Sequence, residues 1–281
     1  MKWQADRERR WREISARLET ETADSNLRIV VLAAHPDDET IGASLLLSRF
    51  PKSSVVFLTD GAPKNTKLWP PGMRGSKENY ADLRREEAVT ALSIAGISEK
   101  AIFWLGGVDQ EAVFEIRPLG DEFRQILMQT RADLVITHPY EGGHPDHDAA
   151  AVVACIAASS LDNPPVLLEM TSYHARNGQC VTGEFLNSEQ AQQMSFKLSE
   201  SDRDLKRRMI HTYVSQRLVL ENFPVAEESL RLMPTYNFSQ PPHEGQLWYE
   251  IMGWMAGDRW RETVRESVIE TLAKHQVQAC R

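Results

Sequence analysis

Two short segments of the chain concentrate histidines and carboxylates. The first, with the sequence AHPDDE, contains His35, Asp37 and Asp38, and the second, GGHPDHD, contains His144 and His147. Imidazole and carboxylate groups are the usual nitrogen and oxygen ligands of zinc and of several other divalent metals. If the two segments meet in the folded protein, they supply the ligands of one metal site.

A simpler explanation exists for each segment. Asp37 and Asp38 can cap the helix that follows, because the N-terminal end of a helix favours carboxylates, but capping leaves the neighbouring histidine unexplained. The second segment can be two surface histidines, yet three of the eight histidines fall within residues 138–147. Clustering of this kind beside a second acidic motif favours a shared site.

The apolar runs indicate which elements position these segments. Nearly continuous apolar runs are typical of strands covered on both faces, and they occur at 27–34, 54–59, 101–105, 133–137 and 166–170. Helix-like stretches separate the runs, around 40–50, 80–96, 111–130 and 145–160. This alternation predicts an α/β fold with a Rossmann-like, mostly parallel sheet and helices on both of its faces.

Each histidine segment follows one of the predicted strands. Pro36 ends the first strand directly after His35, while Pro145 suits the first turn of a helix with His144 at its cap and His147 one turn inside. Ligands of open α/β sheets bind beyond the carboxyl ends of the strands, where the strand order reverses. Because strands one and four are the usual neighbours at such a reversal, we expect the two loops to face each other.

The chain on either side of this core has different patterns. Trp11, Ile14 and Leu18 share one face of a predicted N-terminal helix, at the spacing of amphipathic packing. Later in the chain we expect a helix, an ordered loop in which prolines prevent a regular helix and a second helix, over 188–221, 234–243 and 254–274. We therefore predict a single domain, made of an N-terminal helix, an α/β core with the metal site and a C-terminal appendage that covers the substrate cleft: residues 1–26, 27–171 and 172–281.

Composition argues against several classes of protein. The formal net charge is -8 and the basic runs are interrupted, which argues against a nucleic-acid partner. No apolar run approaches the ~20 residues of a membrane span, and the N-terminus lacks the apolar core of a signal peptide. Cys155, Cys180 and Cys280 are too widely spaced for a disulfide framework or a thiolate metal site. We expect a cytoplasmic protein, and the sequence leaves a homo-oligomer open.

The two segments resemble the LmbE-like/PIG-L metal-dependent N-deacetylases. The marks of that family are an AHPDDE loop after the first strand and a later HPDH loop, and both are intact here. Further similarity lies in the segments VFLTDG, RREEA and WLGGVD, at residues 56–61, 84–88 and 104–109. The resemblance covers residues 28–150 and is looser over 166–281.

The resemblance implies a role for each residue of the two segments. His35, Asp38 and His147 hold one divalent ion, zinc or else iron(II), and leave positions open for water and substrate. Asp37 is implied to be the general base that takes a proton from the attacking water. His144 is implied to stabilise the oxyanion or to protonate the departing amine. The implied enzyme is a zinc-dependent N-deacetylase that hydrolyses the acetamide of an N-acetylglucosamine-containing substrate.

Three further residues are candidate substrate contacts. Arg84 and Asp109 match family positions that touch the substrate, and each can instead be an ordinary helix charge or loop cap. Tyr140 lies near the second segment, although this chain has Gly142 and Gly143 where other members carry an aromatic residue closer to the catalytic histidine. The expected partner is a small-molecule or oligosaccharide N-acetyl sugar, either free, in a chitooligosaccharide, or linked to a lipid or nucleotide.

Several aromatic residues can stack on a sugar or simply anchor the core. They are Trp69, Tyr236, His243, Trp248 and Tyr249.

Two other functions use similar ligands. Two histidines and a carboxylate form the facial triad of non-haem iron oxygenases, but those triads normally have His-x-Asp spacing, and here the first pair is His-x-x-Asp. A non-catalytic metal-binding module is the other alternative, and it leaves Asp37 without a purpose. Oxygen consumption separates the oxygenase from the hydrolase.

Overall fold

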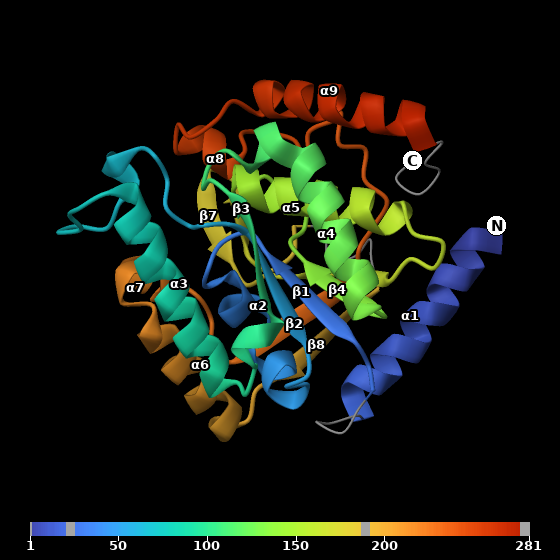
Figure 1. The fold of residues 1–281 in the computed structure, drawn as a ribbon, viewed down its shortest axis with the longest axis horizontal. Coiled ribbons are helices and arrows are strands. Elements are labelled where there is room, and N and C mark those ends of the chain that lie inside the picture. The colour runs from blue at the N-terminus through green and yellow to red at the C-terminus, as the bar shows by residue number, and fades with distance from the viewer. Residues whose placement is uncertain (1, 21–25, 187–191, 276–281) are drawn as a thin grey trace.

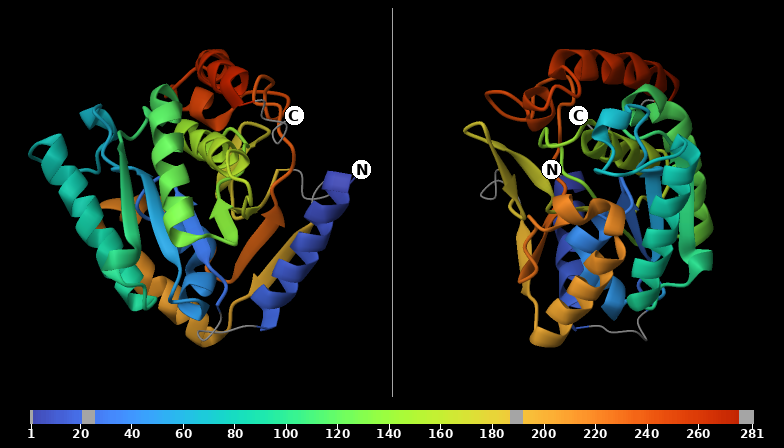
Figure 2. Two further views of the ribbon diagram at one scale, coloured as in Figure 1. Left: turned by 45° about the vertical axis from the view of Figure 1, so that its right-hand side comes forward. Right: turned by 90° about the vertical axis from the view of Figure 1, so that its left-hand side faces the viewer.

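A seven-stranded sheet forms the centre of the protein, with helices on both faces (Figures 1 and 2). The structure is a computed structural model, and it describes residues 2–20, 26–186 and 192–275. The strand order is β3-β2-β1-β4-β5-β9-β8. The α/β fold class predicted from the apolar runs is confirmed.

The strands of this sheet are β1 (Ile29–Ala33), β2 (Ser54–Thr59), β3 (Ile102–Gly107), β4 (Leu134–Thr137), β5 (Val166–Met170), β8 (Gln193–Lys197) and β9 (Glu227–Leu232). A separate hairpin consists of β6 (Tyr173–Arg176) and β7 (Gln179–Thr182). The helices are α1 (Lys2–Thr20), α2 (Asp38–Arg49), α3 (Lys77–Ile94), α4 (Ile116–Thr130), α5 (Pro145–Ser159), α6 (Glu200–Thr212), α7 (Arg217–Leu220), α8 (Trp248–Ile251) and α9 (Gly257–His275). Short 3-10 helices are η1 (Thr66–Leu68), η2 (Glu99–Ala101), η3 (Ala112–Glu115) and η5 (Val214–Gln216).

The strand order reverses at β1, as the sequence predicts. β1 pairs in parallel with β2 on one side and with β4 on the other, where Val31 lies opposite Ile136. The chain therefore leaves β1 and β4 at the same edge of the sheet. The two histidine loops begin there.

Two apolar layers hold the helices against the sheet. On one face, α1, α2, α3 and α6 cover side chains such as Val31 and Phe57. On the other face, α4, α5 and α9 cover Val30 and Leu32. Alternate residues of β1 thus point into opposite layers, because side chains alternate along a strand. In the described part of the chain, no helix is long and apolar enough to span a membrane.

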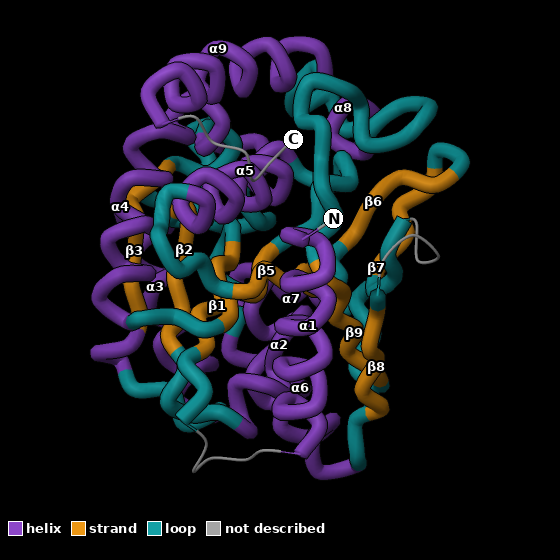
Figure 3. The backbone as a smooth tube through the Cα atoms, turned by 90° about the vertical axis from the view of Figure 1, so that its right-hand side faces the viewer, coloured by secondary structure: helices purple, strands orange, loops and turns teal. Residues whose placement is uncertain are grey.

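The prediction of continuous helix over 188–221 is wrong in its first part. Residues 188–191 lie outside the described residues, but β8 follows, and helix begins only at Glu200. Met194 and Phe196 pack against the core while their neighbours are exposed, which is the period of a strand. β8 pairs antiparallel with β9, which is antiparallel to β5, so part of the C-terminal segment extends the central sheet (Figure 3).

A buried ion pair joins this C-terminal extension to the core. The Lys206 side chain is fully buried, and its Nζ donates to Glu228 at 2.9 Å and to the carbonyl of Ile41 at 2.6 Å. The contact connects α6, β9 and α2. A buried charge of this kind needs its partner, because an unpaired one keeps the full desolvation cost.

Lys206→Met is therefore expected to lower the free energy of unfolding by about 3–5 kcal/mol, measured by urea denaturation. Arg207→Met is the matched control on the same helix, because Arg207 pairs with Asp204 in an exposed position and should contribute far less. Equal losses in the two variants would contradict the structural role of the buried pair.

Candidate metal centre

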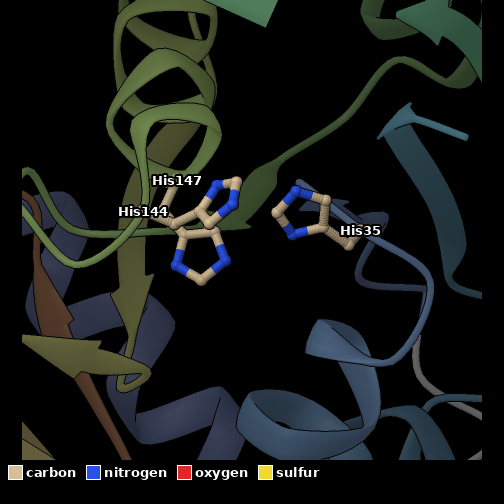
Figure 4. Close-up of side chains that lie close together, drawn as sticks. All are labelled: His35, His144 and His147. Carbon is tan, nitrogen blue, oxygen red and sulfur yellow. The ribbon is translucent and has the colours of Figure 1, made fainter. Parts of the chain in front are cut away.

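His35 lies at the meeting point of the two loops. The loop after β1 is fixed on both sides, because Ala34 donates its N–H to Nε2 of His138 at 3.0 Å and accepts from the N–H of Thr59 at 3.0 Å. The His35 ring centroid is 4.5 Å from that of His144 and 5.3 Å from that of His147. Figure 4 shows the three imidazoles converging from the first loop and from the start of α5.

Asp38 lies between the two other predicted ligands. Its Oδ2 is 3.3 Å from Nδ1 of His35, and its Oδ1 is 3.3 Å from Nε2 of His147. The same carboxylate accepts the backbone N–H of His35 at 2.8 Å, which holds it beside the strand end. The structure thus brings His35, Asp38 and His147 together at one place.

The start of α5 orients both of its histidines. His144 is the N-cap, with Pro145 in the first turn, and its Nδ1 accepts the N–H of Asp146 at 3.1 Å. The ring proton of neutral His144 is therefore on Nε2, which lies 3.0 Å from the side-chain amide nitrogen of Gln110; an Nε2–H donates to this amide only when the amide is turned to present its oxygen. Burial lowers the pKa of His144 to about 3. His144 therefore offers an N–H donor without a positive charge.

His147 is oriented by a residue from the end of β5. The hydroxyl of Ser172 lies 3.2 Å from Nδ1 of His147, and burial together with the charge of His138 lowers the pKa of His147 to about 3. A neutral imidazole whose Nδ1–H donates to a hydroxyl presents Nε2 as a lone pair. This is the usual outer-shell arrangement of a histidine metal ligand.

A third loop joins the cluster through Asp146. The side chain of Asp146 accepts the N–H groups of Gln110 at 2.6 Å and of Ala112 at 3.1 Å, and its Oδ2 lies 3.1 Å from Nε2 of His35. These contacts hold the loop after β3. That loop places Asp109 beside His35, with Oδ1 of Asp109 at 3.4 Å from Nε2.

Asp37 is buried next to the predicted ligands in an unusual backbone conformation. Its φ is 131°, a region that non-glycine residues rarely adopt, and such strain is concentrated at functional sites. Arg84 donates to the Asp37 carboxylate at 3.1 Å and to the carbonyl of Pro36 at 2.5 Å. Burial raises the pKa of Asp37 to about 7, against the opposing charge of Arg84. A carboxyl with this pKa can accept a proton near neutral pH.

A second set of contacts holds the strained backbone from the other side. The N–H of Asp37 donates to Oε2 of Glu39 at 3.0 Å, and Oε1 of Glu39 accepts the hydroxyl of Tyr213 at 2.5 Å. Tyr213 follows α6, so the C-terminal part of the chain supports the position of Asp37.

The donor set of this cluster fits a divalent cation. Three overlapping groups have potential ligand atoms within 4.8 Å of one another: His35/His144/His147, His35/Asp109/His144/Asp146 and Asp38/His138/His147. Oδ1 of Asp109 is buried without hydrogen-bond geometry to any described residue. Although burial opposes it, the carboxylates of Asp109, Asp146 and Asp38 raise the pKa of His35 well above its ordinary value. Carboxylates that favour positive charge at an imidazole also favour a cation there.

The candidate substrate contacts have different surroundings. Arg84 is 2% exposed and bonded to Asp37, while Asp109 is at the cluster itself. Tyr140 lies in an aromatic cluster and donates its hydroxyl to the carbonyl of Gln240 at 2.8 Å. The structure brings Arg84 and Asp109 to the predicted ligands and directs the Tyr140 hydroxyl to the C-terminal loop.

The other aromatic candidates are also accounted for by packing. The Tyr236 hydroxyl donates to Glu169 at 2.6 Å, Tyr249 is fully buried, and Trp69 packs 5.3 Å from Tyr80. Nδ1 of His243 is hydrogen-bonded to the carbonyl of the neighbouring Glu244. The backbone N–H of Trp248 donates to the carbonyl of Gly142.

Residues that the sequence analysis did not single out complete the cluster. Asp146 and His138 lie within the stretch that contains the histidine cluster, so the signal for them was present in the sequence. Ser172 and Gln110, together with Trp254, whose ring is 5.0 Å from that of His144, had no signal in the sequence that linked them to this cluster. Only the folded chain shows that they belong here.

Comparison with known families identifies the part of the chain that carries this site. Residues 30–158 match the PIG-L family, described as GlcNAc-PI de-N-acetylase. The chain is similar to the PIG-L family over this part. The matched residues run from β1 to the end of α5 and include both histidine loops.

Individual relatives are distant. A 1D-myo-inositol 2-acetamido-2-deoxy-alpha-D-glucopyranoside deacetylase from Saccharopolyspora erythraea is 27% identical over 206 residues, covering 62% of this chain and 66% of that relative. The N,N'-diacetylchitobiose deacetylase of Pyrococcus horikoshii has a TM-score of 0.55 at 19% identity, covering 79% of this chain and 92% of that one. The 4-carboxy-2-hydroxymuconate hydratase of Pseudomonas putida has a TM-score of 0.50 at 17% identity, covering 75% and 98%. The structural matches establish a shared fold.

Binding of a divalent ion to the cluster should stabilise the folded protein. An ion present at a thousand times its dissociation constant adds about 4 kcal/mol to the free energy of unfolding. We expect the thermal midpoint to fall after chelation and to rise again on addition of zinc or iron(II). An identical midpoint with and without metal would show that the cluster holds no ion.

Proposed function

We propose that the protein is a metal-dependent N-deacetylase that hydrolyses the acetamide of an N-acetylglucosamine-containing substrate. The observation that carries this proposal is the position of Asp37 and His144 beside the proposed ligands His35, Asp38 and His147, which places a carboxylate base and an imidazole donor next to the proposed ion. The PIG-L match over residues 30–158 and the deacetylase names of the relatives support it.

His35, Asp38 and His147 are the proposed ligands, and zinc is the proposed ion. Asp38 lies 3.3 Å from a nitrogen of each imidazole, and the remaining nitrogens have partners in Asp146 and Ser172. These residues would hold a divalent ion, and the chemistry it would supply there is polarisation of the acetamide carbonyl and a lower pKa of water. Iron(II) fits the same donor set, because two imidazoles and one carboxylate do not select strongly between these ions.

Asp37 is the proposed general base. It accepts the proton of the attacking water while the water oxygen bonds to the acetamide carbon. Arg84 and Glu39 hold it in place through its carboxylate and its N–H, at 3.1 Å and 3.0 Å. When the carbon–nitrogen bond breaks, the proton passes to the nitrogen, and the products are acetate and a free amine.

His144 is proposed to stabilise the oxyanion rather than to act as the acid. Its Nδ1 accepts a backbone N–H at 3.1 Å, so the neutral ring has its proton on Nε2, on the side that faces Gln110 and Asp109. A fixed N–H donor in a buried site stabilises developing negative charge without reorganisation.

The acetamide is the part of the substrate that these residues recognise. A similar fold occurs in a protein named as a hydratase, so the proposed amide hydrolysis rests on the residues of the site and not on the fold. The N-acetylglucosamine part of the substrate is proposed from the names of the relatives, which are deacetylases of such sugars.

Asp37→Asn should retain the metal and lose activity by orders of magnitude, because amide nitrogen cannot replace the base. Metal content is measured by elemental analysis and acetate release by a coupled assay. Asp133→Asn is the matched control, since Asp133 pairs with Arg28 at the opposite end of β4. Full activity of Asp37→Asn would exclude this aspartate as the base.

Metal removal should abolish amine release, and stoichiometric zinc or iron(II) should restore it. The substrates to compare are free N-acetylglucosamine, a chitooligosaccharide, and lipid- and nucleotide-linked N-acetylglucosamine. Amine is detected with a fluorogenic reagent. Undiminished turnover by metal-free protein would contradict the mechanism, and absence of turnover on every sugar would contradict the substrate class.

A further inference from the structure

The β6–β7 hairpin begins at the metal centre. Ser172 and Tyr173 follow β5 after Thr171, and both contact His147: the Ser172 hydroxyl is 3.2 Å from its Nδ1, and the Tyr173 ring is 5.1 Å from its ring. Ser172 also accepts the N–H of Gly183 at 2.8 Å, which closes the base of the hairpin. Figures 1 and 3 show the hairpin on the side of the sheet where α8 lies.

Gly143 allows this close approach. A Cβ at position 143 would lie 1.9 Å from the carbonyl oxygen of Tyr173 and 3.3 Å from its ring carbon Cδ2. Any side chain there would collide with the backbone of the hairpin. The glycine before His144 therefore lets Tyr173 lie against the loop that contains His144 and His147.

The Tyr173 side chain lies against His147. It is half-buried, with its ring edge-on to His147 at 65° and 6.1 Å from the ring of Phe223. The ring contact with His147 and the contact of the Tyr173 backbone with Gly143 place this side chain beside the loop that contains His144 and His147.

We propose that Tyr173 is a catalytic hydrogen-bond donor of this site, whose hydroxyl binds the carbonyl oxygen of the substrate acyl group as negative charge develops on it. The proposal rests on the proposed hydrolysis. It would place a phenol donor from the hairpin alongside the N–H of His144. No proton is transferred: the O–H of Tyr173 donates a hydrogen bond and keeps its proton.

Tyr140 does not offer such a donor. Its hydroxyl is bonded to the carbonyl of Gln240, within a cluster that contains Tyr236, Phe238 and Trp260. Tyr173 differs from Tyr140 because its side chain is partly exposed and its ring lies against His147. Its partial exposure also leaves it accessible.

The test compares Tyr173→Phe with the wild-type protein, both loaded with zinc. We expect kcat to fall about 10²-fold with KM nearly unchanged, as for loss of one oxyanion donor. The dissociation constant of acetohydroxamate, which presents a carbonyl oxygen to the metal, should rise about tenfold by calorimetry. Zinc content and thermal midpoint should equal those of the wild type, because the ring packing is retained.

Thr182→Val is the matched control. Thr182 lies opposite Tyr173 in the hairpin, and its hydroxyl donates to the carbonyl of Asn222 at 3.0 Å. This variant removes a hydroxyl from the same hairpin, so it reports any structural effect, and its kcat and acetohydroxamate affinity should match the wild type.

Two results would overturn the proposal. Wild-type kcat and acetohydroxamate affinity in Tyr173→Phe would show that the hydroxyl has no role, and loss of zinc from this variant would show a purely structural one. Failure of the wild-type protein to release amine from any N-acetylated sugar is a separate result: it would contradict the proposed function, while the acetohydroxamate comparison still tests the hydroxyl.

Discussion

The arrangement of this protein depends on gathering several carboxylates in one buried place. Asp37, Asp38, Asp109 and Asp146 come from three loops at the same edge of the sheet, and burial makes the repulsion between them costly. Arg84 compensates Asp37, and the imidazoles accept or donate hydrogen bonds around the others. A divalent ion bound among these carboxylates would offset their remaining negative charge.

The same constraint explains why the supporting contacts extend so far into the fold. Asp146 fixes the loop after β3, and Glu39 connects the backbone of Asp37 to Tyr213 behind α6. Ser172 connects His147 to the hairpin at the end of β5. Ligands held by such outer contacts keep their orientation before an ion or substrate binds, which reduces reorganisation when charge develops.

Sequence reasoning predicted the parts of this structure whose patterns are local. The strands β2 and β5 have the predicted bounds, and the reversal at β1 follows from the order of strands and helices. The strand β8 was missed because Met194 and Phe196 form too short an alternation to distinguish a strand from one face of a helix. β9 was missed because charged residues such as Glu228 and Arg231 are typical of an exposed segment. In the structure both are buried and form ion pairs, with Lys206 and Glu169.

The site could be predicted only as far as the motifs extend. His35, Asp38 and His147 stand in recognisable segments, and the parallel sheet explains why those segments meet. Ser172 and Tyr173 reach the same histidine from a hairpin whose position depends on tertiary packing against Gly143, and a single sequence contains no signal for that contact.

The account is tested most directly by anomalous diffraction at the zinc edge from crystals of the zinc-loaded protein. It predicts one strong peak bounded by His35, Asp38 and His147, with Asp37 and His144 beside the ion but outside its ligands. A peak held by other residues, or none in this cluster, would contradict the assignment of the metal site and the hydrolysis built on it.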